Sequence, residues 1–294
     1  MDIARNRLAR AFAVACAVLL LAPLAARADF RMEKTLAFES GASFRLETDS
    51  GSVSVTGTSG SAAEVVITSR RDDIEERFDF SFDDSGSGAR IRVEKRGGWM
   101  RSWFSDGGGM HFEVRLPRNA EVFVDTAGGR ITLESIEGEV ELRTSGGSIG
   151  VDEVTGDVIA DTSGGAIKIS SIQGDVNADT SGGSISIRDV SGQAVADTSG
   201  GAISMRDVGG DVVADTSGGG IDIDGAGGMV KADTSGGPVT VVFAVGNDHG
   251  GSLSSSGGRV TAVVDPSVGL EIDASSSGGS VRTDVPLTVR GQVS

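Results

Sequence analysis

Five aspartates recur at intervals of 18 residues and form the most regular set of ionisable side chains in the chain. If equivalent residues of successive repeats stack as neighbouring strands, their carboxylates lie in a row about 4.8 Å apart. Such a row could bind calcium, which takes several oxygen ligands. It could also accept hydrogen bonds from backbone N–H groups of the turn that follows each aspartate. The set is Asp161, Asp179, Asp197, Asp215 and Asp233.

Turn capping is the explanation that we favour for this aspartate column. Two unit charges about 4.8 Å apart repel by roughly 0.9 kcal/mol in water, and a hydrogen bond to a charged group contributes about 1.5–3 kcal/mol. Capping therefore offsets the repulsion without a metal. Calcium-binding repeats of nine residues place Asp after the glycines, whereas here Asp precedes Gly-Gly. Calcium stays the alternative, and no other cofactor is expected.

A glycine-flanked segment over residues 97–109 holds both tryptophans of the chain. Aromatic and basic side chains clustered in a loop are typical of recognition sites. The same aromatic side chains could instead fold back and close the end of a repeat stack, which is the explanation we favour. The candidate partner-binding residues are Arg96, Trp99, Met100, Arg101, Trp103 and Phe104.

No catalytic constellation stands out in the sequence. His111 flanks the tryptophan segment, and His249 follows Asp248. Serines and aspartates occur throughout the chain, so their nearness to a histidine carries little information. A metal site on either histidine lacks further ligands at a recognisable spacing. We therefore expect no enzymatic activity.

A tetrapeptide turn organises the chain. Thr126-Ala-Gly-Gly129 is followed by Thr-Ser-Gly-Gly at six further positions, each 18 residues after the last. A fixed short period indicates a supersecondary unit that buries its apolar face only against its neighbours. By alternation, the threonine of each turn should point inward, where its hydroxyl bonds along the stack. These turns begin at Thr144, Thr162, Thr180, Thr198, Thr216 and Thr234.

Apolar residues at a spacing of two lie on both sides of each turn. Val158 and Ala160 precede one turn, and Ile167 and Ile169 follow it, as in the other repeats. This alternation predicts two short strands per repeat with alternate side chains inward. The fold class is therefore all-β, a β-solenoid with 18-residue coils. A sandwich of hairpins explains the constant spacing less well, because antiparallel neighbours alternate in direction.

Residues 29–120 predict a less regular, β-rich N-terminal cap. The segment 44–55 is a degenerate strand–turn–strand unit, and most of the phenylalanines lie in this part of the chain. A bulky cap would cover the exposed edge of the stack. Residues 121–242 form the regular coils. Residues 243–294 continue as longer coils and a tail, with turns at Ser255 and Ser276.

The first 28 residues resemble a signal peptide that is cleaved. Three arginines precede the apolar run 11–22, and Ala26-Arg27-Ala28 provides a small-x-small cleavage pattern. We therefore expect export to the periplasm, the cell surface or the medium, with no membrane span in the mature chain. The net charge of −16 repels polyanions, so nucleic acid is excluded as a partner.

A family resemblance rests on the segment Leu46–Gly57 and on the repeated Ala-Asp-Thr-Ser-Gly-Gly-x-Ile units. Together with the leader, these motifs are similar to the bacterial putative-adhesin family of β-solenoid domains. The resemblance spans nearly the whole mature chain and implies the solenoid fold and an adhesin-like role. It implies no catalytic residues, because its motifs are structural turns.

The sequence supports an exported, non-enzymatic β-solenoid that acts as an adhesin-like or cell-envelope interaction or scaffold protein. Its partner would be a protein or polysaccharide surface ligand. A calcium-binding solenoid module and a polysaccharide-acting solenoid enzyme are the alternatives. Outward Ile159, Val195 and Val213 form an apolar stripe that could support self-association.

Overall fold

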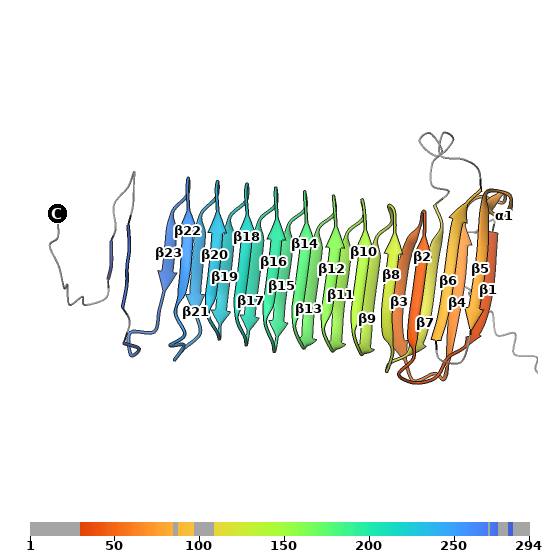
Figure 1. Ribbon diagram of the computed structural model, residues 1–294, viewed down its shortest axis with the longest axis horizontal. Helices are drawn as coiled ribbons and strands as arrows, with labels where there is room; N and C mark the ends of the chain where they lie inside the picture. Colours follow the sequence, from red (N-terminus) through yellow and green to blue (C-terminus); the bar gives the residue numbers. More distant parts are fainter. Residues whose placement is uncertain (1–29, 85–87, 97–108, 270, 276–281, 285–294) are drawn as a thin grey trace, which may run out of the picture.

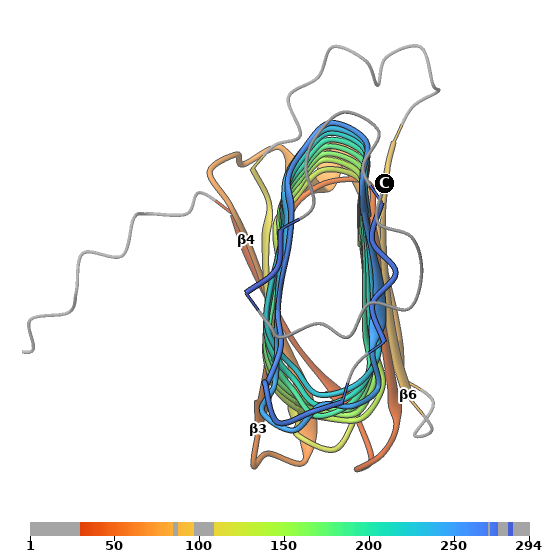
Figure 2. The ribbon, with the colours of Figure 1, turned by 90° about the vertical axis from the view of Figure 1, so that its left-hand side faces the viewer.

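The chain folds as one row of stacked coils (Figure 1). The computed structural model describes residues 30–84, 88–96, 109–269, 271–275 and 282–284. Its strands form two sheets of 12 and 11 strands, here called sheet 1 and sheet 2. Viewed along the stack, the sheets are the two long sides of a flattened tube that narrow turns close (Figure 2). The predicted all-β solenoid is confirmed.

The regular coils each contribute one strand to each sheet. Those of sheet 2 are β8 (Glu121–Thr126), β10 (Val140–Thr144), β12 (Val158–Thr162), β14 (Val176–Thr180), β16 (Ala194–Thr198), β18 (Val212–Thr216), β20 (Val230–Thr234) and β22 (Gly251–Ser255). Those of sheet 1 are β9 (Ile131–Glu137), β11 (Ile149–Thr155), β13 (Ile167–Gln173), β15 (Ile185–Val190), β17 (Ile203–Val208), β19 (Ile221–Ala226), β21 (Val239–Phe243) and β23 (Val260–Val263).

Parallel pairing without a register shift stacks equivalent residues from coil to coil. Val158 pairs with Val176, and Ala160 with Ala178, in sheet 2. In sheet 1, Ile167 pairs with Ile185. Small inward side chains on sheet 2 therefore face isoleucines of sheet 1, and both are buried in one continuous core. The core runs the length of the stack, because no coil could bury its apolar residues alone.

A residue in the left-handed conformation near the end of the sheet 1 strands adds a third inward column that the sequence analysis missed. The register of β11 with β13 leaves out the equivalent residues Glu153 and Ser171, whose φ angles are 55° and 60°. This residue reverses the alternation of side chains, so the residue after it turns inward. In one later coil Gly225 occupies this position with φ 79°. The added column, buried throughout, is Ile136, Val154, Ile172, Val190, Val208 and Ala226.

The Thr-Ser-Gly-Gly turn is held by its threonine. Thr180 Oγ1 donates to the Gly165 carbonyl of the previous coil at 2.9 Å and accepts from its own Gly183 N–H at 3.3 Å. The inward position predicted for the threonines is confirmed, since Thr180 is 1% exposed. Its partners are backbone groups of two successive coils. Each turn is thereby tied to the coil before it.

The N-terminal cap is confirmed, with a more complex path than the sequence indicates. Its elements are β1 (Phe30–Ala37), β2 (Ser43–Thr48), β3 (Ser52–Thr58), β4 (Ala62–Ser69), α1 (Ile74–Arg77), β5 (Phe78–Asp84), β6 (Gly88–Lys95) and β7 (His111–Pro117). Strands β2 and β3 form the first coil and pair in parallel with β8 and β9. Strand β4 runs antiparallel to β1 and β7, and β5 antiparallel to β6.

Bulky side chains fill the cap core. Phe44, Phe78 and Phe112 are fully buried there. These rings replace the Ala–Ile pairing of the regular coils, which supports the predicted capping role. The antiparallel strands also end the parallel stack, so the regular coils present no open edge on this side.

Beyond β21 the solenoid continues for one longer coil. Residues 244–250 form the predicted excursion, and Asn247 Nδ2 donates to the carbonyl oxygens of Ala226 and Gly228 at 2.7 and 2.8 Å. The second longer coil, expected around Ser276, stays a prediction, because residues 276–281 lie outside the described residues. Residues 271–275 and 282–284, which are described, lie in no strand.

Candidate functional site

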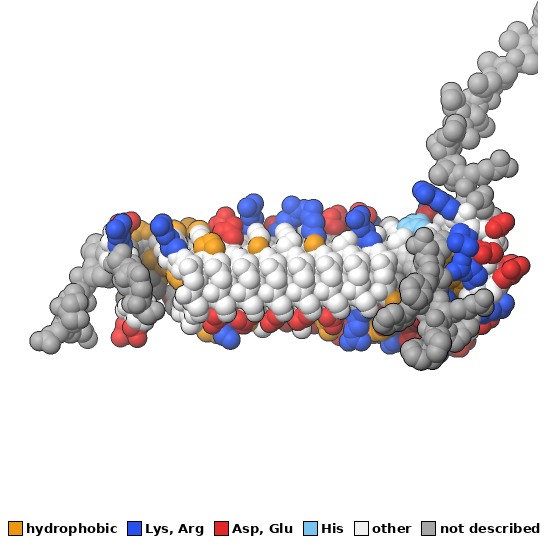
Figure 3. All heavy atoms as spheres, turned by 90° about the horizontal axis from the view of Figure 1, so that it is seen from above, with side chains coloured by type: hydrophobic (Ala, Val, Ile, Leu, Met, Phe, Trp, Pro, Cys, Tyr) orange, Lys and Arg blue, Asp and Glu red, His pale blue; other side chains and the backbone are white. Residues whose placement is uncertain are grey.

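The predicted aspartate column lies on the outer face of sheet 2. In-register pairing joins Asp161 to Asp179 and continues in the same way to Asp233. We call these five residues the aspartate ladder. Toward the cap, the same outer column continues through Arg143, Asp125 and Glu47. Acidic side chains form a row along one edge of the pale strip of turns in Figure 3.

The ladder does not cap the turns, contrary to the explanation favoured from the sequence. The threonine hydroxyl already occupies that place, because it points into the turn while the aspartate before it points outward. Aspartates at the opposite corner of the coils do accept backbone N–H groups. Asp157, Asp175 and Asp211 each bond the following coil, at 2.9, 2.8 and 2.8 Å.

Basic side chains of the protein itself contact two residues of the ladder, its first and its fourth. Arg143 Nε is 4.0 Å from Asp161 Oδ2, and Lys231 Nζ is 3.9 Å from Asp215 Oδ2. Between them, Asp179 and Asp197 are in register with carboxylates on both sides. Partial burial, followed by repulsion from Asp161 and Asp197, raises the pKa of Asp179 above the ordinary range. Keeping the Asp179 carboxylate ionised at neutral pH therefore lowers the stability of the folded protein.

The calcium proposal for the ladder gains no support from side-chain clustering. Among the described residues, no three acidic, histidine or cysteine side chains are grouped closely enough to hold a metal ion. Calcium usually takes six to eight oxygen ligands, so the ladder would have to bind it with water completing the shell. A thermal melt distinguishes a calcium ladder from a repulsive one.

We predict that Asp179→Asn raises the melting temperature at neutral pH. Because the pKa of Asp179 is raised in the folded protein, the folded state binds this proton more tightly than the unfolded state does. The free energy of unfolding therefore falls as the pH rises from the pKa of Asp179 in the unfolded state through its pKa in the folded state. Asparagine does not ionise, so the variant does not lose this stability. The gain should be about 1 kcal/mol or less after screening.

Melts of both proteins at low and neutral pH, with EDTA and with calcium, check this prediction. The gain should shrink in acid and persist in EDTA. A calcium-dependent rise in melting temperature that Asp179→Asn abolishes would contradict the repulsive ladder and establish the cation site.

An apolar stripe lies beside the ladder on the same face, as predicted. Ile159 is 43% exposed, and Val195 and Val213 are half-buried in the same outer column. Toward the cap this column continues through Phe123, whose ring lies under the guanidinium of Arg45 at 3.8 Å. The sequence analysis missed this ring contact, because it joins two strands far apart in the chain.

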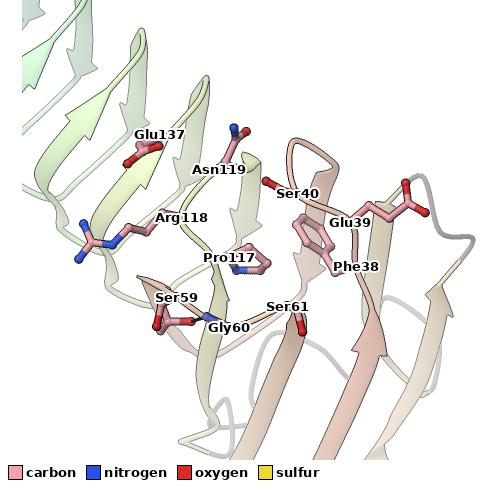
Figure 4. Close-up of a pocket in the computed structure, with 11 residues that line it drawn as sticks. Phe38, Glu39, Ser40, Ser59, Gly60, Ser61, Pro117, Arg118, Asn119 and Glu137 are labelled. Atoms are coloured by element: carbon pink, nitrogen blue, oxygen red, sulfur yellow. Dashed lines mark hydrogen bonds between the residues drawn. The ribbon is translucent and has the colours of Figure 1, made fainter.

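A hollow lies where cap and coils meet (Figure 4). Its volume is about 490 Å³, and three chain connections line it. Phe38 and Pro117 give it apolar walls, and Arg118 lines it too. The carboxylates of Glu39 and Glu137 lie at opposite ends of the hollow in Figure 4, so they do not form a pair.

A second hollow of about 290 Å³ lies on sheet 1. It sits over Gly150, where the outer column lacks a side chain, and Lys168 and Arg188 border it. Asp152 at its floor accepts a hydrogen bond from Ser170 Oγ at 2.7 Å. Both hollows open broadly to solvent and follow the surface.

The candidate partner-binding segment falls mostly outside the described residues. Trp99, Met100, Arg101, Trp103 and Phe104 belong to residues 97–108, which the structure does not describe. Its flanking Arg96 forms an ion pair with Asp79 at 2.6 Å. The plug and the binding loop therefore both stay predictions.

The ring of each histidine lies near a polar side chain. Ser52 Oγ lies 2.9 Å from His111 Nδ1 on the outer face of sheet 1. His249 Nδ1 lies 3.5 Å from Asp248 Oδ1. The serine pair and the aspartate pair involve different histidines. These two contacts of the described residues therefore do not join into the serine–histidine–carboxylate arrangement of acyl transfer.

Solved structures share this fold. A protein described as a "putative lipid binding protein" from Parabacteroides distasonis ATCC 8503 matches with a TM-score of 0.53 and 13% identity, over 79% of this chain and 96% of that one. A "putative adhesin" from Bacteroides fragilis NCTC 9343 matches with a TM-score of 0.47 and 15% identity, over 80% and 97%. No family model and no curated protein sequence matches the chain. The solenoid fold that the resemblance implies agrees with the fold of the structure from Parabacteroides distasonis.

Proposed function

We propose that this protein is an exported, non-enzymatic β-solenoid that binds a partner in the cell envelope or at the cell surface. The observation that carries the proposal is the uninterrupted outer surface of the coils. From β8 to β21 every coil repeats without an insertion, so both sheets present long, flat faces. Rigid parallel stacking fixes the side chains of these faces at the strand spacing.

The same surface argues against a solenoid enzyme. A catalytic site needs an acid, a base or a nucleophile that converge on one point in a concave site. Both hollows described above are open to solvent, and the carboxylates of Glu39 and Glu137 lie at opposite ends of the one where cap and coils meet (Figure 4). The faces instead suit recognition over a wide area.

Export is supported by the leader pattern of residues 1–28, which lie outside the described residues. No helix of the described part of the chain has the length and hydropathy needed to cross a membrane. The resemblance to adhesin-like solenoids supports a place at the surface or in the periplasm. A protein or polysaccharide of the envelope would then be the partner.

Binding without turnover tests the proposal. The purified full chain is incubated with immobilised polysaccharides and with washed envelope fractions, and both depletion of protein and release of reducing ends are measured. We expect saturable depletion with no reducing ends above the blank. A matched variant, Ser52→Ala with His111→Ala, removes the hydrogen-bonded pair on sheet 1. The proposal gives this pair no role, so the variant should bind as well as the wild type. Release of reducing ends by the wild type that this variant loses would contradict the proposal.

A further inference from the structure

The outer face of sheet 2 between β12 and β20 carries three parallel rows of side chains. The aspartate ladder is one row, and the corner aspartates are another. Between them runs the column that holds Ile159, Val195 and Val213. From β12 to β20 this middle column reads Ile159, Asn177, Val195, Val213 and Lys231, so three of its five side chains are apolar. The ladder flanks it on one side, and on the other side lies the corner column, which has Asp at three of five positions.

The charge of this face is almost entirely negative. Over the strands and their preceding corners there are eight aspartates and one lysine. The aspartates are Asp157, Asp161, Asp175, Asp179, Asp197, Asp211, Asp215 and Asp233, and the lysine is Lys231. On sheet 1 the same coils place Lys168 beside Ser186, and Arg188 between Ser170 and Arg206. The two faces therefore differ in the partner they attract.

Apolar side chains reach the surface of this charged face. Ile159 is 43% exposed, and Met229 at the neighbouring corner is 47% exposed. Val195 and Val213 are direct neighbours in the middle column, and apolar side chains grouped within a polar rim are typical of interaction surfaces. A partner that covers this column removes apolar area from water, which contributes about 25 cal/mol for each Å² buried.

We propose that this face, here called the acidic face, binds a cationic amphipathic polypeptide segment. Basic side chains of the partner would pair with the two acidic rows, and its apolar side chains would cover the row between them. The inference rests on the proposed function, because it names the partner class of the binding surface. Complementary charge would also steer the encounter, and binding would weaken as salt increases.

The protein already places its own cations on the ladder in this way. Arg143 reaches Asp161, and Lys231 reaches Asp215, from neighbouring strands. The two central carboxylates, Asp179 and Asp197, have only aspartates as in-register neighbours. A partner cation placed over these two carboxylates reduces the repulsion between them. This reduction makes the binding free energy more favourable. The central pair is therefore the expected point of strongest contact.

Three synthetic peptides of equal length test the acidic face. The first alternates Lys and Leu, the second Lys and Ser, and the third Glu and Leu. Calorimetric titration of the full chain at low and high salt gives each dissociation constant. We expect the Lys-Leu peptide to bind about tenfold more tightly than Lys-Ser, and the Glu-Leu peptide not to bind. Equal affinity of Lys-Leu and Lys-Ser, or no binding of either, overturns the proposal.

Matched double variants locate the binding. Asp179→Asn with Asp197→Asn, and separately Ile159→Asn with Val195→Asn, should each weaken Lys-Leu binding about tenfold. Asparagine already stands in the middle column at Asn177, so the coil accepts it, and a circular dichroism melt confirms folding. The control Asp222→Asn with Asp224→Asn changes charge equally on sheet 1 and should leave affinity within about twofold. An equal loss in the control indicates unspecific attraction and overturns the proposal.

Other outcomes separate this inference from the proposed function. If the chain binds envelope fractions but no cationic peptide, the inference about the acidic face is wrong and the proposed function is retained. If the peptide binds as expected while reducing ends are released from a polysaccharide, the proposed function is wrong and the inference about the acidic face is retained. Self-association of the chain, abolished by Ile159→Asn, would assign the middle column to a second copy and overturn the inference.

Discussion

Replacing Gly183 by alanine is expected to lower the melting temperature by about 10 °C or to prevent folding. Gly183 is the second glycine of a Thr-Ser-Gly-Gly turn. A Cβ atom built on it would come closer than 3.0 Å to the carbonyl group of Gly165, the equivalent residue of the previous coil. Both groups belong to backbone that is fixed by stacking, so neither can move aside cheaply.

The size of the effect follows from where the clash falls. Overpacking in a well-packed interior costs about 1–3 kcal/mol and sometimes more. Here the overlap is with backbone, and relieving it requires two coils to separate. We expect a loss of about 3 kcal/mol or more, and a chain of this size loses roughly 2–4 °C for each kcal/mol.

The neighbouring glycine provides a matched control. A Cβ at Gly182 would have no atom nearer than the Ser163 carbonyl oxygen at 3.7 Å, an ordinary contact distance. Gly182→Ala should therefore melt within a few degrees of the wild type, about 1 kcal/mol either way. Equal melting temperatures of the two variants, measured by circular dichroism, would contradict the close backbone stacking of the turns.

Thr180→Val is expected to destabilise the protein by about 2–4 kcal/mol. Valine keeps the shape of threonine but loses the hydroxyl that joins the Gly165 carbonyl to the Gly183 N–H. The side chain is 1% exposed, so water cannot replace the lost partner. A buried polar group left without its partner costs about 1–3 kcal/mol, and two groups are affected. Denaturant unfolding at equilibrium measures the change.

Thr180→Ser separates the hydroxyl from the methyl group. Serine already takes this place in a later coil, where Ser255 Oγ donates to Gly237 O and accepts from Gly258 N, both at 2.8 Å. The Ser variant should lose about 1 kcal/mol, since only a buried methyl group is removed. A Ser variant as unstable as the Val variant would show that packing, and not the hydrogen bonds, holds the turn.

The repeat itself made most of the solenoid predictable. Inward Val158 and Ile167, and their equivalents at every 18th residue, predict both strands and their register. The left-handed residue was not predicted, because a reversal of alternation at Glu153 looks like the end of a strand in the sequence. The path of the cap was also hidden. Pairing of β2 with β8, across an intervening excursion of the chain, depends on long-range packing.

The sequence predicts where the side chains of the candidate site lie, but not which groups they bind. Periodicity placed Asp179 and Ile159 on the outer face, where both lie. The role of turn cap was given to the wrong residue, because threonine and aspartate are adjacent and both can accept a backbone N–H. Only the inward direction of Thr180 decides between them. The contact of Arg45 with Phe123 joins β2 to β8 and follows from the cap's folding.

Carboxylate footprinting most directly tests the claim that an outer face of the coils binds the partner. The full chain is labelled at exposed carboxyl groups with and without the Lys-Leu peptide, and the labelled sites are read by mass spectrometry. Labelling of Asp179 and Asp197 should fall on binding, while labelling of Asp222 and Asp224 on sheet 1 should not change. An equal fall on both sheets, or a fall confined to Glu39 and Glu137 at the hollow, would contradict recognition by the acidic face.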